Sequence, residues 1–332
     1  MPMGEEEPME LEIKKESPSS KEERERVEGI VEKNLNRVIE ILRAKNYGII
    51  EPVKSVRQEV KEGLEEAPEA EERKGHETRV IGFAGKGGVG KTTLAALFIR
   101  AIGEEEGSPS ILAMDSDPNT CLPEMLGSQD YETLGDMVEK YRGATLPIQK
   151  FRQEFASLLL RNEQEGYDLL PMGRSEDQGC YCMVNNLLRS SFRDEVLKGS
   201  YAYDYVVMDC EAGIEHISRK TSAIVSDLVI ITDGSQLGMN TVRNIREVGR
   251  KVKIDIDNFY VVVNGVEAEE IIKDVKNLSD ELEITFLGTV PYDDAVKKLS
   301  FRGGSVFELP EDSCAYSKVK EFVRTMLSRD QK

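Results

Sequence analysis

The chain has 332 residues and a formal net charge of -18, and 39% of its residues are hydrophobic. That length allows one large domain, or two, with a substantial core. The acidic balance argues against nucleic acid as the main partner, because phosphate contacts need clustered Lys and Arg. The sequence has no run of eighteen apolar residues and no basic-then-apolar signal pattern at its start, so we expect a cytoplasmic protein without a membrane partner.

The first segment, residues 1–77, is expected to form an acidic helical arm with flexible ends. Ser20 and Glu23 make a capping box, and apolar residues from Val27 to Leu42 follow at helical spacing. A shorter helical stretch, 53–64, precedes an acidic linker. We expect this arm either to pack on its own domain or on a dimer mate, or to dock another protein.

The remaining segment, residues 78–332, alternates apolar runs with stretches long enough for crossover helices. Such continuous runs are typical of parallel strands that are covered on both faces. We therefore predict an α/β fold with a mostly parallel sheet of about seven strands and helices on both faces. Its ligand should lie at the carboxyl ends of the strands. The predicted strands are 80–84, 110–115, 167–171, 204–209, 227–232, 259–264 and 284–290.

A phosphate-binding loop follows the first strand, because Gly85, Gly90, Lys91 and Thr92 fit the pattern G-x-x-x-x-G-K-[ST]. Its glycines let the backbone curl so that amide N–H groups point at phosphates, and the start of the next helix adds partial positive charge. Lys91 is expected to reach the β- and γ-phosphates, and the Thr92 hydroxyl to ligate Mg²⁺. Residues 78–332 are therefore predicted to be a P-loop ATPase domain. The predicted nucleotide-binding residues of the loop are Gly85, Lys86, Gly87, Gly88, Val89, Gly90, Lys91, Thr92 and Thr93.

A second lysine, Lys86, makes the string Lys-Gly-Gly-Val-Gly-Lys-Thr-Thr, which resembles the deviant phosphate loop of the nucleotide-dependent dimerising ATPases. This group includes the nitrogenase iron protein, the chromosome-partition and septum-positioning ATPases, and the nickel-insertion ATPases of carbon monoxide dehydrogenase. The resemblance implies ATP and Mg²⁺ as cofactors and a homodimer in which Lys86 reaches the partner's phosphates and stabilises transition-state charge. It makes Lys86, Lys91 and Asp117 the catalytic residues. A solvated surface lysine is the alternative.

Three aspartates lie at or just beyond the ends of buried strands and are expected at the carboxyl edge of the sheet. Asp115 and Asp117 follow the apolar run of the second strand, and Asp209 ends the fourth. Carboxylates there can organise the waters around Mg²⁺ and orient an attacking water. By resemblance, Asp115 and Asp209 belong to the metal shell and Asp117 orients the water. A competing interpretation makes Asp117 the cap of a helix that starts at Pro118.

The residues after Asp209, Cys-Glu-Ala-Gly-Ile-Glu-His, resemble the second switch of the nickel-insertion branch. His216 is a weak site candidate without assigned chemistry, and the spacing of the cysteines pairs none of them with Cys210. Cys121 and Cys314 are interpreted as packing residues. An odd total of five cysteines without framework spacing favours metal or redox use over structural disulfides.

The sharpest candidate metal site is the pair Cys180 and Cys182. Two thiolates two residues apart in extended backbone point to the same side and can share one soft metal. One chain supplies two thiolate ligands, whereas a closed thiolate site has four. A symmetric dimer would provide all four. The resemblance to the nickel-insertion ATPases of carbon monoxide dehydrogenase and acetyl-CoA synthase implies this site, with Ni²⁺ or Zn²⁺ bound. A pair of ordinary, partly buried thiols is the alternative.

Asn264 and Pro291 are the candidate contacts to the base. Asn264 ends the sixth strand, where the related ATPases contact the adenine edge, and Pro291 lies where they approach the base from the other side. An amide side chain offers a donor and an acceptor together, which matches adenine N6 and N7. The turn Asn264-Gly265 would explain an Asn equally well. The expectation of ATP rather than GTP therefore rests mostly on the resemblance.

The last predicted helix, 315–327, combines an apolar stripe with basic residues. Septum-positioning relatives end in a basic amphipathic helix that binds membranes. A helix docked on its own sheet needs the same stripe, and Glu311 and Asp312 would oppose an anionic surface. We therefore expect this helix to dock within the domain.

Three functions follow from these features. The first is an ATP-dependent metallochaperone that binds Ni²⁺ or Zn²⁺ and supports nickel insertion into a carbon monoxide dehydrogenase or acetyl-CoA synthase client. The second is an iron–sulfur electron donor resembling the nitrogenase iron protein, which is disfavoured because that family's cysteines come from separated loops. The third is a non-metal positioning ATPase, whose expected marks, a basic face or a membrane tail, are weak or absent in the sequence.

Overall fold

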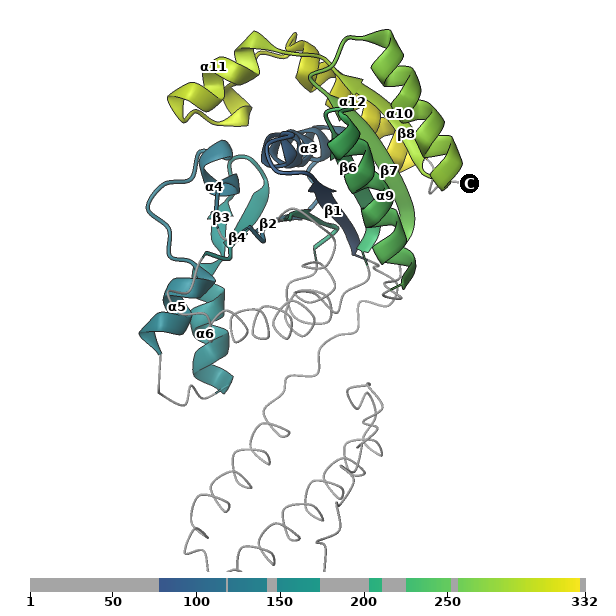
Figure 1. The fold of residues 1–332 in the computed structure, drawn as a ribbon. Helices are drawn as coiled ribbons and strands as arrows, with labels where there is room; N and C mark the ends of the chain where they lie inside the picture. Colours follow the sequence, from purple (N-terminus) through teal and green to yellow (C-terminus); the bar gives the residue numbers. More distant parts are fainter. Residues whose placement is uncertain are drawn as a thin grey trace, which may run out of the picture. The chain divides into compact units, whose positions relative to one another are not determined.

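A computed structural model describes residues 78–117, 119–141, 148–173, 203–210, 225–251 and 256–328. These residues build an eight-stranded sheet in the order β3-β4-β2-β5-β1-β6-β7-β8, with helices on both faces (Figure 1). The predicted α/β fold with a mostly parallel sheet is confirmed. The strands are β1 (Arg79–Gly85), β2 (Ile111–Asp115), β3 (Leu160–Asn162), β4 (Tyr167–Pro171), β5 (Tyr205–Asp209), β6 (Val225–Thr232), β7 (Ile256–Asn264) and β8 (Thr285–Val290).

The strand β3 was not among the seven predicted. It pairs antiparallel with β4 at the edge of the sheet, whereas the other neighbouring strands are parallel. With three residues, Leu160-Arg161-Asn162, it is too short and too polar to show a strand pattern. A tight turn holds it in place, in which Gly166 has a φ of 75° and donates its N–H to the Asn162 carbonyl at 2.9 Å.

The central strands are continuous apolar runs because both faces of the sheet are buried. Along β1, Val80 and Ala84 belong to the core on one face, while Ile81 and Phe83 belong to the core on the other. All four side chains are at most 2% exposed. This alternation is the direct consequence of the two-residue period of a strand.

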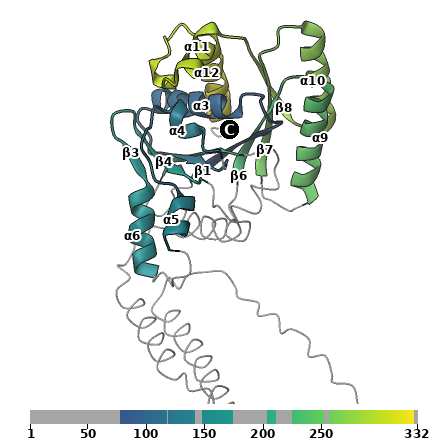
Figure 2. The same cartoon turned by 60° about the vertical axis from the view of Figure 1, so that its left-hand side comes forward.

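One layer of helices covers each face of the sheet, as Figures 1 and 2 show. The first core contains side chains of α5 (Leu134–Lys140), α6 (Ile148–Leu158), α9 (Gln236–Lys251) and α10 (Glu269–Leu282). The second core contains side chains of α3 (Lys91–Glu105), α4 (Leu122–Met125), α11 (Asp294–Arg302), the 3₁₀ turn η2 (Val306–Glu308) and α12 (Cys314–Leu327).

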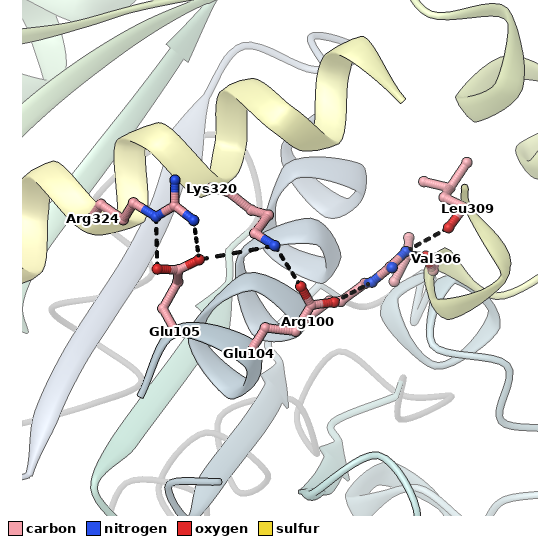
Figure 3. Close-up of polar contacts among 7 residues, drawn as sticks. All are labelled: Arg100, Glu104, Glu105, Val306, Leu309, Lys320 and Arg324. Atoms are coloured by element: carbon pink, nitrogen blue, oxygen red, sulfur yellow. Dashed lines mark hydrogen bonds and ion pairs between the residues drawn. The ribbon is translucent and has the colours of Figure 1, made fainter. Parts of the chain in front are cut away.

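The helix α12 docks within the domain, as predicted. Its apolar face is buried, and its basic residues contact acidic residues on α3 (Figure 3). Lys320 Nζ lies 2.8 Å from Glu104 Oε2, and Arg324 Nε lies 2.7 Å from Glu105 Oε2. Burial of a large apolar side chain such as Phe322 contributes about 1.5–3 kcal/mol, so packing supplies most of the stabilisation and the ion pairs set the position. In the described part of the chain, no helix is long and apolar enough to cross a membrane.

Candidate functional site

The phosphate loop connects β1 to α3 at the carboxyl edge of the sheet, where close packing requires two of its glycines. Gly85 has a φ of 146°, and a Cβ there would lie 2.3 Å from the Ile231 carbonyl oxygen of the neighbouring strand β6. Gly90 has a φ of 91°, and a Cβ there would lie 2.5 Å from Asn264 Nδ2. The loop is therefore held between β6 and the end of β7 in one conformation that larger residues could not adopt.

The start of α3 is suited to bind an anion. Its N-cap residue is Gly90, so no side chain caps the first turn and its amide groups remain available to a ligand. Lys91 is 9% exposed, and its ammonium group donates to the Lys86 carbonyl at 3.4 Å. Thr92 and Thr93 lie in the same turn. The predicted phosphate-binding residues thus surround one helix N-terminus.

Two buried aspartates lie beside this loop. Asp115 and Asp209 are partners in the register of β2 and β5, and both are at most 1% exposed. Asp209 Oδ2 accepts from the Thr92 hydroxyl at 2.6 Å, whereas its Oδ1 is buried without a hydrogen-bond partner among the described residues. Asp115 accepts from the amides of Asp117 and Leu122, each at 2.9 Å. The orphaned oxygen of Asp209 therefore points to a ligand beside Thr92.

Burial dominates the electrostatics of this pair. It raises the pKa of Asp115 to about 7, with the charge of Asp209 adding to the effect and the two amide donors opposing it. Burial also raises the pKa of Asp209 to about 6, although the Thr92 hydroxyl and the charge of Lys91 oppose the rise. Two carboxylates that resist ionisation side by side gain the most from a cation placed between them.

A third buried aspartate shows what a structural carboxylate looks like in this fold. Asp227 lies near the amino ends of β1 and β6, where Arg79 forms an ion pair with its Oδ2 and Asn258 Nδ2 donates to its Oδ1 at 3.0 Å. Asp115 and Asp209 have no such cation paired with them within hydrogen-bonding distance among the described residues. The oxygens of Thr92, Asp209 and Asp115 are the donor set that Mg²⁺ prefers, and we assign them as its candidate site.

Asp117 lies at the rim of this site and is partly exposed. Its Oδ1 accepts from the Asn119 amide at 2.8 Å, which closes a local turn. The competing expectation of a helix starting at Pro118 is not met in the described residues, where α4 begins at Leu122; Pro118 itself lies outside them. The role of Asp117 in orienting water stays a prediction.

Asn264 contacts the phosphate loop directly. Its Nδ2 donates to the Val89 carbonyl at 2.8 Å, so its side-chain oxygen is the group left to accept from the amino group of a base. The segment with Pro291 begins beside it, because Asn264 pairs in register with Val290. Asp293 then fixes this segment. It accepts from the Ala295 amide in α11 at 2.7 Å, and from the Ser313 hydroxyl and the Ala315 amide at the start of α12. The base-contact role of Asn264 and Pro291 remains a prediction.

The cysteines divide into two groups. Cys180 and Cys182, together with His216, lie outside the described residues. Cys210 is buried in the core, whereas Cys121 and Cys314 are exposed, so the prediction that these two are packing residues is wrong. Cys121 precedes α4 and its Sγ lies 3.8 Å from the Asn119 carbonyl oxygen, whereas Cys314 opens α12 and its Sγ lies 3.2 Å from Asp293 Oδ2. No cluster of three or more His, Cys, Asp or Glu suited to a metal occurs within the described residues.

Sequence reasoning missed one residue at this edge. Asp233 follows β6 directly, and its Oδ2 lies 3.2 Å from Lys86 Nζ. The signal was available, because an acidic residue at the carboxyl end of an apolar run is the same pattern that indicated Asp115 and Asp209. The sequence does not show that β6 pairs with β1. This pairing brings Lys86 and Asp233, which are 147 positions apart, into contact.

Residues 80–306 match the family described as the CobQ/CobB/MinD/ParA nucleotide binding domain. The chain belongs to this family. An uncharacterized ATP-binding protein of Methanocaldococcus jannaschii is 35% identical over 261 residues, which cover 75% of this chain and 99% of that relative. The carbon monoxide dehydrogenase accessory protein CooC of Rhodospirillum rubrum is 26% identical over 245 residues, which cover 69% of this chain and 89% of CooC.

A solved structure with the same fold is the septum site-determining protein MinD of Pyrococcus horikoshii, complexed with Mg-ADP. Its TM-score is 0.56 at 21% identity, and the match covers 77% of this chain and 99% of that one. The family match, the phosphate loop and the paired aspartates all indicate a nucleotide-binding domain. The chain is a nucleotide-binding P-loop ATPase of the MinD/ParA type.

Proposed function

We propose that this ATPase is a metallochaperone, in which ATP-driven closure of a homodimer controls a Ni²⁺ or Zn²⁺ site built from Cys180 and Cys182. The observation that carries the proposal is the Cys-x-Cys pair within a domain that is similar to the carbon monoxide dehydrogenase accessory protein over 245 residues. The metal is cargo, and its destination is a carbon monoxide dehydrogenase or acetyl-CoA synthase client.

The described residues support a proposal for the ATP site. The amides of the first turn of α3 and the Lys91 ammonium bind the phosphates. Thr92, Asp209 and Asp115 would hold Mg²⁺, which would neutralise the charge of the phosphates. Asp117, at the rim, orients the attacking water. Lys86 supplies a cation to the nucleotide of the partner protomer, where it stabilises charge in the transition state.

The position of the cysteines along the chain supports a link between the two sites. The segment that carries them leaves β4 at Pro171, which pairs in register with Asp115 at the carboxyl edge. Cys180 and Cys182 are seven and nine residues beyond Gly173, and nine extended residues span at most about 32 Å. The length of the connecting chain therefore allows the cysteine pair at most about that distance from Gly173. A change at the phosphates can then alter how two such segments meet in a dimer.

The test is metal analysis of the Cys180→Ala/Cys182→Ala double variant, prepared anaerobically. We expect the variant to lose stoichiometric Ni²⁺ or Zn²⁺ while largely keeping its ATP hydrolysis. A matched control is Cys121→Ala/Cys314→Ala, which removes two exposed thiols elsewhere and should keep the metal. Undiminished metal in the first double variant would refute the site, and a brown iron–sulfur chromophore in the unmodified protein would favour an electron donor instead.

A further inference from the structure

The two lysines of the phosphate loop are linked through residue 86. The Lys86 ammonium forms an ion pair with Asp233 at 3.2 Å, while the Lys86 carbonyl accepts from the Lys91 ammonium at 3.4 Å. Phosphates that attract Lys91 would remove the second of these contacts. Residue 86 would then keep its side-chain contact with Asp233 and lose its backbone contact.

Asp233 is held rigidly on its own protomer. Its Oδ1 accepts from the Ser235 hydroxyl at 2.6 Å and from the Ser235 amide at 3.1 Å, and the Ser235 hydroxyl oxygen accepts in turn from the Gly238 amide at the start of α9. Gly234 has a φ of 66°, and its amide donates to the Thr232 hydroxyl at 3.1 Å. This tight turn leaves Oδ2 directed at Lys86. The Ser235 hydroxyl, and then Lys86, lower the pKa of Asp233.

We propose that Asp233 is a positioning residue that holds Lys86 within its own protomer and competes with the partner's phosphates for it. The inference rests on the proposed function, in which Lys86 acts across the dimer. Formation of that contact has to break the ion pair in each protomer. The carboxylate thereby raises the protein concentration at which the ATPase becomes active, and it limits hydrolysis by chance encounters of two chains.

The exposure of the Lys86 and Asp233 side chains sets the expected size of the effect on dimerisation. The Lys86 and Asp233 side chains are 33% and 37% exposed, so solvent screens the pair. Pairs of this kind shift an equilibrium by about 1.4- to 5-fold. Because a dimer breaks two of them, removing the carboxylate should strengthen ATP-dependent dimerisation by about 2- to 25-fold, the square of that range.

The experiment measures ATP hydrolysis per chain against the concentration of the full-length protein. Asp233→Asn keeps an oxygen for the Ser235 contacts and removes the acceptor for Lys86, and Asp233→Ser is a second variant that can preserve the turn. Both should reach half-maximal activity at a lower protein concentration, with the same activity at saturation and the same affinity for ATP. Glu321→Gln, which removes the acceptor of an exposed ion pair with Lys318 on α12, is the control and should shift nothing.

The outcomes separate this inference from the proposed function. One outcome is that Lys86→Ala abolishes hydrolysis while neither Asp233 variant shifts the concentration dependence. That result would refute the retention of Lys86 by Asp233 and would leave the action of Lys86 on the partner's nucleotide intact. Lower activity of the Asp233 variants at saturating protein would also refute the hold, because the carboxylate would then act in the closed dimer. Normal hydrolysis by Lys86→Ala would refute the trans lysine itself. Asp233→Asn added to Lys86→Ala should change nothing further.

Discussion

Replacement of Asp115 by Asn should raise the free energy of unfolding of the protein at pH 8 in the absence of nucleotide and divalent cation. Burial and the charge of Asp209 raise the pKa of Asp115 from 3.8 to about 7 in the folded protein. The folded state therefore binds the proton more tightly than the unfolded state, and stability is lost as the pH rises from about 4 through about 7. Asparagine carries no proton to lose.

The rise in pKa corresponds to about 4 kcal/mol once both states are ionised. The asparagine side chain of the variant would keep one acceptor but would turn its NH₂ group toward the amide of Asp117 or Leu122, which costs about 1–3 kcal/mol. The net gain at pH 8 is then about 1–3 kcal/mol, or a few degrees in Tm. At pH 5 the gain should shrink or reverse, because most of the wild-type Asp115 is protonated there.

Thermal unfolding of both proteins at pH 5 and pH 8 in EDTA measures this difference, and titrating groups far from Asp115 cancel in the comparison. Asp227→Asn is the control, because that buried carboxylate is paired with Arg79 and its loss should destabilise at both pH values. Adding Mg²⁺ and ATP should stabilise the wild type more than Asp115→Asn. A variant that is less stable than the wild type at pH 8 would contradict the electrostatic account of this site.

Three further predictions concern the loop and the terminal helix. Lys91→Ala should lose nucleotide binding in a calorimetric titration, whereas Lys86→Ala should bind ATP and fail to hydrolyse it; equal effects of the two changes would contradict their separate roles. Gly90→Ala places a Cβ 2.5 Å from Asn264 Nδ2 at a φ of 91°, so it should weaken ATP binding at least about tenfold, near 1.4 kcal/mol. Phe322→Ala, in the face of α12 that packs on α3 and β8, should lower the free energy of unfolding by about 3–5 kcal/mol in urea titrations, and a loss below about 1 kcal/mol would mean that the helix is not anchored by packing.

Most of the fold could be predicted because the central strands have a pattern that is local to each of them. A strand covered on both faces, such as β1 or β6, must be apolar along its length, and this pattern depends on no other part of the chain. The strand β3 was missed because three residues, Leu160-Arg161-Asn162, carry too little pattern. The strand β3 forms because the turn at Gly166 lets it pair with β4, so it depends on the whole hairpin and not on its own three residues.

The candidate site was predictable where it follows strand ends and not where it depends on strand order. Thr92 and Asp209 could be expected to meet, because a phosphate loop and an acid that closes a buried strand belong at the same edge. The contacts of Asn264 with Val89 and of Asp233 with Lys86 require the order β1-β6-β7, which the sequence leaves open. Each of these contacts joins residues more than 140 positions apart, and the packing of the whole sheet creates them.

Native mass spectrometry of anaerobically prepared protein, with and without ATP, tests the central claim most directly. The account predicts that ATP and Mg²⁺ produce a dimer that carries one Ni²⁺ or Zn²⁺ per two chains, and that Cys180→Ala/Cys182→Ala forms the dimer without the metal. A single chain that holds the metal by itself, or a double variant that keeps it in the dimer, would contradict a shared thiolate site between protomers.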